Sequence, residues 1–294
     1  MIRLLRISLL MVWALTAFTP ASAEDEREGG IIGTGIVGTI TKLGSIWVNG
    51  QHIELSPKLR VADSPALKLA TGLQPGHTVA VIAEHSASGW VARYVRQVLP
   101  LVGPIEAVSP DHVTIMGTEV RLPKPYGFNI GDWVAVSGLW QDNRVIASRL
   151  DAVPAGRRVA RISGSFIGNI ANGQPSVGQT RILRITPRHA RPGDFIVAYG
   201  TPVPGGLKAK RLEKNLFAGD VGVMLVEGYL SPPAPDGVYS LLGSGLVSYT
   251  DNPGMIDPTQ HGYFCGGQGK LMGIASQDKA SKGASNIEQA LGCK

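Results

Sequence analysis

One internal spacing occurs three times in the chain and constrains its fold more than any other feature. Each time, a glycine opens an apolar strand pattern, and an alanine in the next strand pattern follows 16 residues later. The three pairs are Gly76 and Ala92, Gly131 and Ala147, and Gly193 and Ala209. A fixed spacing of this kind indicates tandem structural repeats, and the unequal lengths before each glycine are typical of surface loops.

Each repeat consists of short segments with strand periodicity. Apolar and polar residues alternate at 46–48, 113–115 and 134–136, which predicts strands with one buried and one solvated face. The first two repeats each contain five such segments, and residues 181–185 are the best candidate for a middle strand in the third. The 38 glycines and 20 prolines exclude a long-helix or coiled-coil protein, because helix interiors tolerate neither residue in such numbers.

A short helix is predicted between the third and fourth strands of the first repeat. Ser64 can cap it, Pro65 occupies the first helical position and Gly72 follows the last turn. Five strands with a helix at this place have the order of an OB-fold. The second repeat has no room for the helix. We therefore predict an all-β chain of tandem small five-stranded OB-like β-barrels with a glycine-rich, loop-rich C-terminal region.

The last quarter of the chain follows the pattern only in part. Residues 225–230 resemble a first strand and residues 238–249 a hairpin, but the resemblance stops after Gly254. A helix is predicted near 285–291, with Ser285 and Glu288 as a capping box and Gly292 as its end. The expected divisions are a signal peptide (1–23), a flexible acidic leader (24–34), repeats at 35–98, 99–152 and 157–218, and a partial fourth repeat with a divergent tail (219–294).

The first residues have the layout of a cleavable export signal. Arg3 and Arg6 precede a short apolar run at 7–18, and Ala21 and Ala23 are the small residues before a cut. The run is too short to span about 30 Å of hydrocarbon. No later segment has 18 uninterrupted apolar residues, so we expect an exported chain, periplasmic or secreted, with no transmembrane segment after cleavage.

Two cysteines, Cys265 and Cys293, lie near the C-terminus. In an exported protein a disulfide is the default expectation. A metal pair and a reactive thiol are the alternatives, but no Cys-x-x-Cys spacing or clustered histidine favours either. We therefore expect a disulfide and neither a metal nor a cofactor.

The repeat pattern resembles a known family. Its Gly-x-Ile start, Val-x-x-Gly turn, Gly-Asp-x-Val-x-Val strand and closing Val-x-Ala strand are similar to the exported bacterial repeat family numbered 5666 among the domains of unknown function (DUF). The resemblance covers residues 35–214 and extends in part to 249. It implies small β-barrels in secreted or periplasmic bacterial proteins, and it brings no activity. The Gly-Asp pair is present at Asp132 and Asp194 but becomes Gly76-His77 in the first repeat, which argues against a catalytic aspartate.

Catalytic motifs are absent from the sequence. There is no Gly-x-Ser-x-Gly nucleophile elbow, and no two histidines are four residues apart. Ser276 and Lys279 match Ser-x-x-Lys without its companion motifs, and the glycine-rich 266–270 lacks the phosphate-loop spacing. We therefore expect no enzyme. The alternative is an exported hydrolase with its site in the C-terminal region, which requires that Ser244, Asp251, Asp257 and His261 converge in one cleft.

Positive charge is concentrated in the third repeat. Residues 153–218 contain 11 Lys and Arg against 2 Asp and Glu. A basic face here predicts a binding or scaffolding module for an anionic envelope polymer, a lipid surface or a partner protein, whereas export argues against nucleic acid. The alternative is an ordinary solvated basic face. The candidate ligand-binding residues are Arg157, Arg158, Arg161, Lys208, Lys210, Arg211 and Lys214.

The tryptophans allow two interpretations. Four of the five lie in the first two repeats, away from the positive charge. Tryptophan in a small barrel fills the core, or, when exposed on a sheet, can stack on sugars. The residues concerned are Trp47, Trp90, Trp133 and Trp140.

Overall fold

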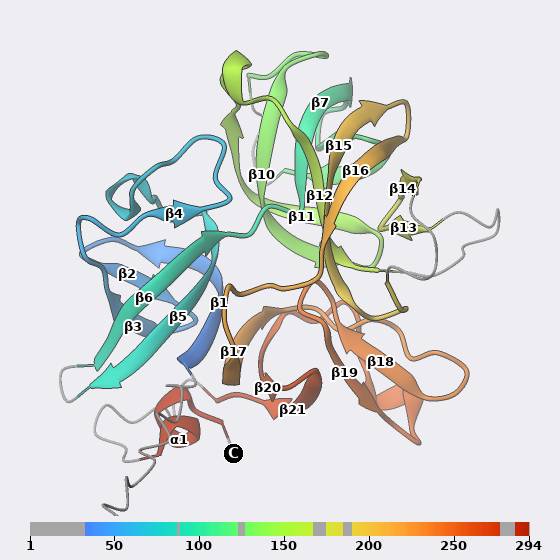
Figure 1. The fold of residues 1–294 in the computed structure, drawn as a ribbon. Helices are drawn as coiled ribbons and strands as arrows, with labels where there is room; N and C mark the ends of the chain where they lie inside the picture. Colours follow the sequence, from blue (N-terminus) through green and yellow to red (C-terminus); the bar gives the residue numbers. More distant parts are fainter. Residues whose placement is uncertain are drawn as a thin grey trace, which may run out of the picture. The chain divides into compact units, whose positions relative to one another are not determined.

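The computed structural model describes residues 33–86, 89–122, 127–166, 175–184, 190–276 and 286–293. The predicted signal peptide and most of the leader therefore lie outside the described residues. The first repeat comprises β1 (Gly33–Lys42), β2 (Ile46–Val48), β3 (Gln51–Glu54), β5 (Thr78–Ser86) and β6 (Gly89–Gln97) (Figure 1). Its strands pair in the closed order β1-β2-β3-β6-β5-β1, with β3 and β6 parallel and all other pairs antiparallel.

The second repeat is a closed barrel with the same order. Its strands are β7 (Leu101–Val108), β8 (His112–Ile115), β9 (Thr118–Arg121), β10 (Trp133–Gln141) and β11 (Arg144–Ala152). They pair as β7-β8-β9-β11-β10-β7, again with the third and fifth strands parallel. The prediction of tandem five-stranded barrels is confirmed by these two units.

The third repeat has the same strand order but is not closed by backbone pairing among the described residues. It comprises β12 (Ala160–Ser165), β13 (Ser176–Val177), β14 (Thr180–Leu183), β15 (Phe195–Val203) and β16 (Gly206–Glu213). The pairs are β12-β15, β15-β16, the parallel β16-β14, and β14-β13. Residues 167–174, which connect β12 to β13, lie outside the described part.

A fourth repeat is complete in its strand order, which corrects the expected divergent tail. It contains β17 (Val221–Gly228), β18 (Val238–Leu241), β19 (Leu246–Tyr249), β20 (Gly262–Gly267) and β21 (Lys270–Ile274). β17 pairs with β20, β20 with β21, and β21 runs parallel to β19. An isolated bridge joins Leu230, two residues after the end of β17, to Leu241 on β18. The glycine-rich residues after Gly254 therefore supply the fourth and fifth strands of this unit.

The 16-residue spacing has a structural cause. Each opening glycine lies at a turn with φ near +90°, a conformation that glycine adopts without strain. The hairpin that follows has the same length in all three repeats. Each hairpin contains one β-bulge, which lies directly after the repeated alanine in its second strand. The residues paired across it are Ala83 and Ala92, Gly138 and Ala147, and Gly200 and Ala209. In the fourth repeat the bulge persists, but Gly266 faces Leu271 only five residues later, so the sequence spacing is lost.

The helix predicted in the first repeat is wrong. Residues 61–72 instead contain the short strand β4 (Val61–Ala62) and the 3-10 helix η1 (Ala70–Gly72). Ser64 caps a turn, since its Oγ accepts a hydrogen bond from the Leu67 amide at 2.8 Å. The chain then folds back, because the Val61 amide donates to the Lys68 carbonyl at 3.1 Å. Those backbone groups are thus used in extended pairing and cannot form helical hydrogen bonds.

The C-terminal helix and the disulfide are confirmed. Helix α1 (Ile287–Leu291) is preceded by Asn286, whose side chain accepts from the Glu288 amide, and is followed by Gly292 in the left-handed conformation. Ser285 lies outside the described residues. Cys265 on β20 is bonded to Cys293, with their Cα atoms 5.8 Å apart. Within the described residues, no helix is long and apolar enough to cross a membrane.

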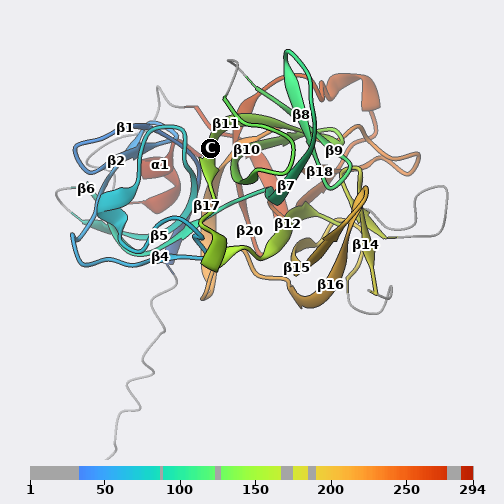
Figure 2. The same cartoon turned by 90° about the horizontal axis from the view of Figure 1, so that it is seen from above.

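The repeats join through shared sheets and a shared core. β12 runs antiparallel beside β7 (Figure 2). β17 pairs in parallel with β1 (Figure 1). One hydrophobic cluster combines side chains from the first, third and fourth repeats with the connection between the last two. Its buried members include Val37, Ala80, Phe195, Val197, Phe217, Leu241 and Phe264.

Candidate functional site

The repeated residue after each opening glycine is a turn cap. Asp132 Oδ2 accepts from the Asn129 amide at 2.8 Å, and Asp194 Oδ2 accepts from the Arg191 amide at 2.9 Å. In the first repeat His77 Nδ1 accepts the equivalent hydrogen bond, from Gln74, at 2.9 Å. The imidazole thus replaces the carboxylate in one structural role, which explains why the Gly-Asp motif varies.

His77 also links the first two repeats. It is 1% exposed, and its Nε2 lies 2.9 Å from Asp151 Oδ2. Because Nδ1 accepts a hydrogen bond, the neutral ring carries its proton on Nε2 and donates to Asp151. Burial raises the pKa of Asp151, but hydrogen bonds from His77 and Arg149 outweigh this and hold the pKa below its ordinary value. The pair therefore stabilises the contact between two barrels.

The four residues of the hydrolase alternative are each engaged locally. Ser244 is buried, and its Oγ donates to the Leu241 carbonyl at 2.7 Å. Asp251 accepts from Tyr249 and Asp257 from Thr259, whereas His261 lies 2.9 Å from Glu227. Of the four, only Ser244 lines the large cavity described next. The four residues therefore do not meet in that cavity.

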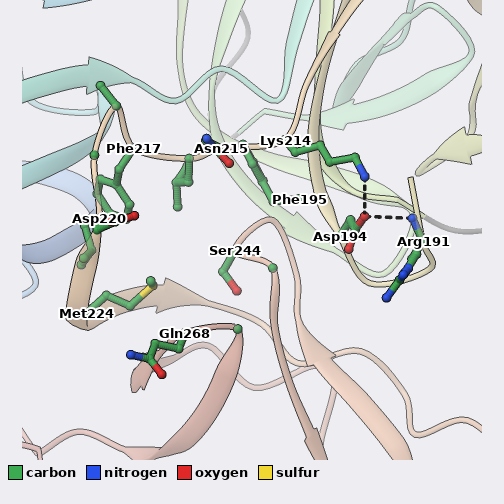
Figure 3. A pocket seen from close by; sticks show the side chains of 16 residues that line it. Arg191, Asp194, Phe195, Lys214, Asn215, Phe217, Asp220, Met224, Ser244 and Gln268 are labelled. Atoms are coloured by element: carbon green, nitrogen blue, oxygen red, sulfur yellow. Dashed lines mark hydrogen bonds and ion pairs between the residues drawn. The ribbon is translucent and has the colours of Figure 1, made fainter. Parts of the chain in front are cut away.

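A cavity of about 970 Å³ lies along the connection between the third and fourth repeats (Figure 3). Lys214 Nζ is 3.4 Å from Asp194 Oδ2, and the same oxygen accepts a hydrogen bond from the Arg191 amide. Figure 3 shows these three residues together at one side of the cavity, with Ser244 and Gln268 on separate loops. Asp220 adds a second carboxylate, so two acids balance the two basic residues of the lining. The cavity therefore has no excess charge.

A second cavity, of about 580 Å³, lies between loop 60–68 of the first repeat and residues 157–161 at the start of the third. We call it the interrepeat pocket. Its apolar wall comes from five residues, and its basic residues face a single carboxylate, Asp63. The lining is Arg60, Val61, Asp63, Ser64, Pro65, Leu67, Lys68, Val102, Arg157, Val159, Arg161 and Tyr199.

The seven basic residues singled out by sequence differ in exposure and in surroundings. Arg161 is 5% exposed and lines the interrepeat pocket with Arg157. Lys214 lines the cavity of Figure 3. Arg158 is exposed, with its guanidinium 6.0 Å from the ring centroid of Trp133. The remaining three lie on β16 and are exposed: Lys208, Lys210 and Arg211.

The tryptophans divide between the two interpretations. Trp90 and Trp140 are buried, and their indole nitrogens donate to Gln51 Oε1 at 2.9 Å and to the Ser163 carbonyl at 2.7 Å. Trp47 and Trp133 are half-buried. Trp90 and Trp140 therefore pack in the core.

No family model, curated protein or solved structure matches this chain. The described residues contain no cluster of three or more His, Cys, Asp or Glu side chains arranged to hold a metal.

Proposed function

We propose that this chain is an exported, non-enzymatic module that binds or scaffolds an anionic component of the bacterial envelope through its third repeat. The predicted export signal and the resemblance to an exported repeat family support the location. The barrel repeats, with their catalytic candidates engaged in turns and interfaces, support binding rather than catalysis.

The observation that carries the proposal is a pair of exposed lysines on β16. Arg211 and Lys214 are paired, with Glu213 at 3.0 Å and Asp194 at 3.4 Å. Lys208 and Lys210 are exposed, and neither lies within ion-pair distance of a carboxylate among the described residues. Their charge is therefore available to an anionic surface.

A charge reversal tests this surface. We expect the variant Lys208→Glu/Lys210→Glu to weaken retention on immobilised polygalacturonate by about tenfold or more, a loss of about 1.4 kcal/mol. The matched control is Lys58→Glu/Lys270→Glu, which removes two other exposed lysines and changes the net charge equally. The control should keep retention within about twofold. If both variants lose retention equally, the loss follows from the change in net charge, which contradicts a specific surface on the third repeat.

Export makes a separate prediction. The mature protein recovered from the envelope or medium should begin at Glu24, because Ala21 and Ala23 occupy the positions before the cut. N-terminal sequencing or intact mass measurement distinguishes this product from the full chain. Recovery of an uncleaved chain from the cytoplasm alone would refute the proposed location.

A further inference from the structure

The interrepeat pocket carries more positive charge than its own carboxylate neutralises. Arg60, Lys68 and Arg157 are exposed at its rim, and Arg161 is buried in its wall. Asp63 is the only acid in the lining. Its carboxylate forms an ion pair with the buried guanidinium of Arg96, so its negative charge is already shared with a cation outside the lining.

Arg161 contributes the buried positive charge of the pocket. Its Nη1 donates to the Asp63 backbone carbonyl at 2.8 Å, whereas Nε and Nη2 have no hydrogen-bond partner. The side chain passes the Tyr199 ring, with the guanidinium 5.8 Å from the ring centroid. Nε and Nη2 are shielded from solvent, so Arg161 acts on the pocket through a charge that water screens only weakly. Burial lowers the pKa of Arg161, although the nearby Tyr199 hydroxyl and Asp63 carboxylate partly compensate the buried charge. An anion in the pocket would offset the remaining cost of burial.

The rim supplies the groups that can contact an anion directly. Arg157 Nη1 donates to the Pro65 carbonyl at 3.2 Å, which holds this side chain across the gap between the two repeats. Arg60 and Lys68 approach from the loop on the other side. Arginine forks and a lysine ammonium are the groups that recognise phosphate oxygens in proteins.

The walls point to an organic moiety beside the anion. Val61, Leu67, Val102 and Val159 line the same space, together with the Tyr199 ring. A volume of about 580 Å³ falls within the range of small-molecule sites. We propose that the interrepeat pocket binds a small phosphate ester, with its phosphate among Arg60, Lys68, Arg157 and Arg161 and its organic part against the apolar wall. This site is separate from the exposed lysines of β16.

Titration calorimetry of the mature chain with phenyl phosphate tests the site. The variant Lys68→Ala/Arg157→Ala removes two exposed rim groups and should weaken binding by about tenfold or more. Its matched control is Lys58→Ala/Lys270→Ala, which removes an equal charge from exposed positions outside the lining. The control should bind within about twofold of the unaltered chain. Because all four side chains are exposed, both variants should keep the same thermal midpoint, which a melting curve checks.

Further measurements distinguish a free phosphate ester from a lipid headgroup. They also distinguish the interrepeat pocket from the exposed lysines of β16. Binding of soluble phenyl phosphate assigns a free phosphate ester. Binding only to phosphatidylglycerol vesicles, lost in Lys68→Ala/Arg157→Ala, assigns a lipid headgroup in the same site. The variant Lys208→Glu/Lys210→Glu should bind phenyl phosphate like the unaltered chain, so the surface proposal can fail while this one stands. Absence of binding to phenyl phosphate and to vesicles at about 10 mM phosphate, or an equal loss in the control, would overturn the assignment.

Discussion

Replacing Arg96 with alanine is expected to lower the free energy of unfolding by about 3 kcal/mol, at the low end for a broken buried ion pair because both acids partly reach water. Arg96 is 6% exposed. Its Nη2 pairs with Asp63 and lies 3.1 Å from Glu213 Oε2, and its Nη1 donates to the Asn215 carbonyl at 2.6 Å. The substitution removes these three contacts at once and leaves Asp63 and Glu213 without their shared cation. Chemical denaturation of the chain measures the loss.

A neighbouring arginine on the same strand provides the control. Arg93 pairs with Glu84 at 2.6 Å, but its side chain is 62% exposed. We expect Arg93→Ala to leave the denaturation midpoint unchanged within error, since exposed pairs contribute little. If Arg96→Ala and Arg93→Ala have the same midpoint, the contact between the first and third repeats does not depend on this network.

Local signals predicted the repeats where each turn is encoded within a few residues. Pro75-Gly76 and Pro192-Gly193 mark turns that the structure contains, and the glycines have φ near +90°. Only the last hairpin of the fourth repeat, β20 and β21, was missed, because it is shorter and begins without such a glycine. The helix after Ser64 was wrongly predicted from its capping signals alone. In the structure Arg60 and Leu69 form an antiparallel bridge, and this extended pairing overrides the local helix signals.

The candidate pocket could be predicted only in part. Charge counting identified Arg157 and Arg161, because they lie in a run of basic residues. Arg60, Lys68 and Asp63 were not identified, since they come from a loop about 90 residues earlier and no spacing connects the two segments. Their meeting depends on how the first and third barrels pack, which repeat periodicity does not encode.

Replacing Trp140 with alanine is expected to destabilise the chain by about 4 kcal/mol, within the range for removing a buried tryptophan. Trp140 belongs to β10 of the second repeat but packs against the third. Its indole lies against Gly164 on β12 and Gly178 beyond β13, where a Cβ at either glycine would collide with the ring. Nε1 donates to the Ser163 carbonyl at 2.7 Å. The indole thus fills the space between β12 and β13, which have no backbone pairing with each other among the described residues.

Trp47 is the control, because it is half-buried and lies on a strand of the first repeat. Trp47→Ala should cost about 2 kcal/mol or less, since much less of its ring leaves water on folding. Hydrogen exchange adds a local test: in Trp140→Ala, amides of β12 and β14 should exchange faster relative to those of β1 and β5, because the lost packing lies at the third repeat. Uniform loss of protection across all four strands would instead mean that Trp140 stabilises the whole chain and not the junction between the second and third barrels.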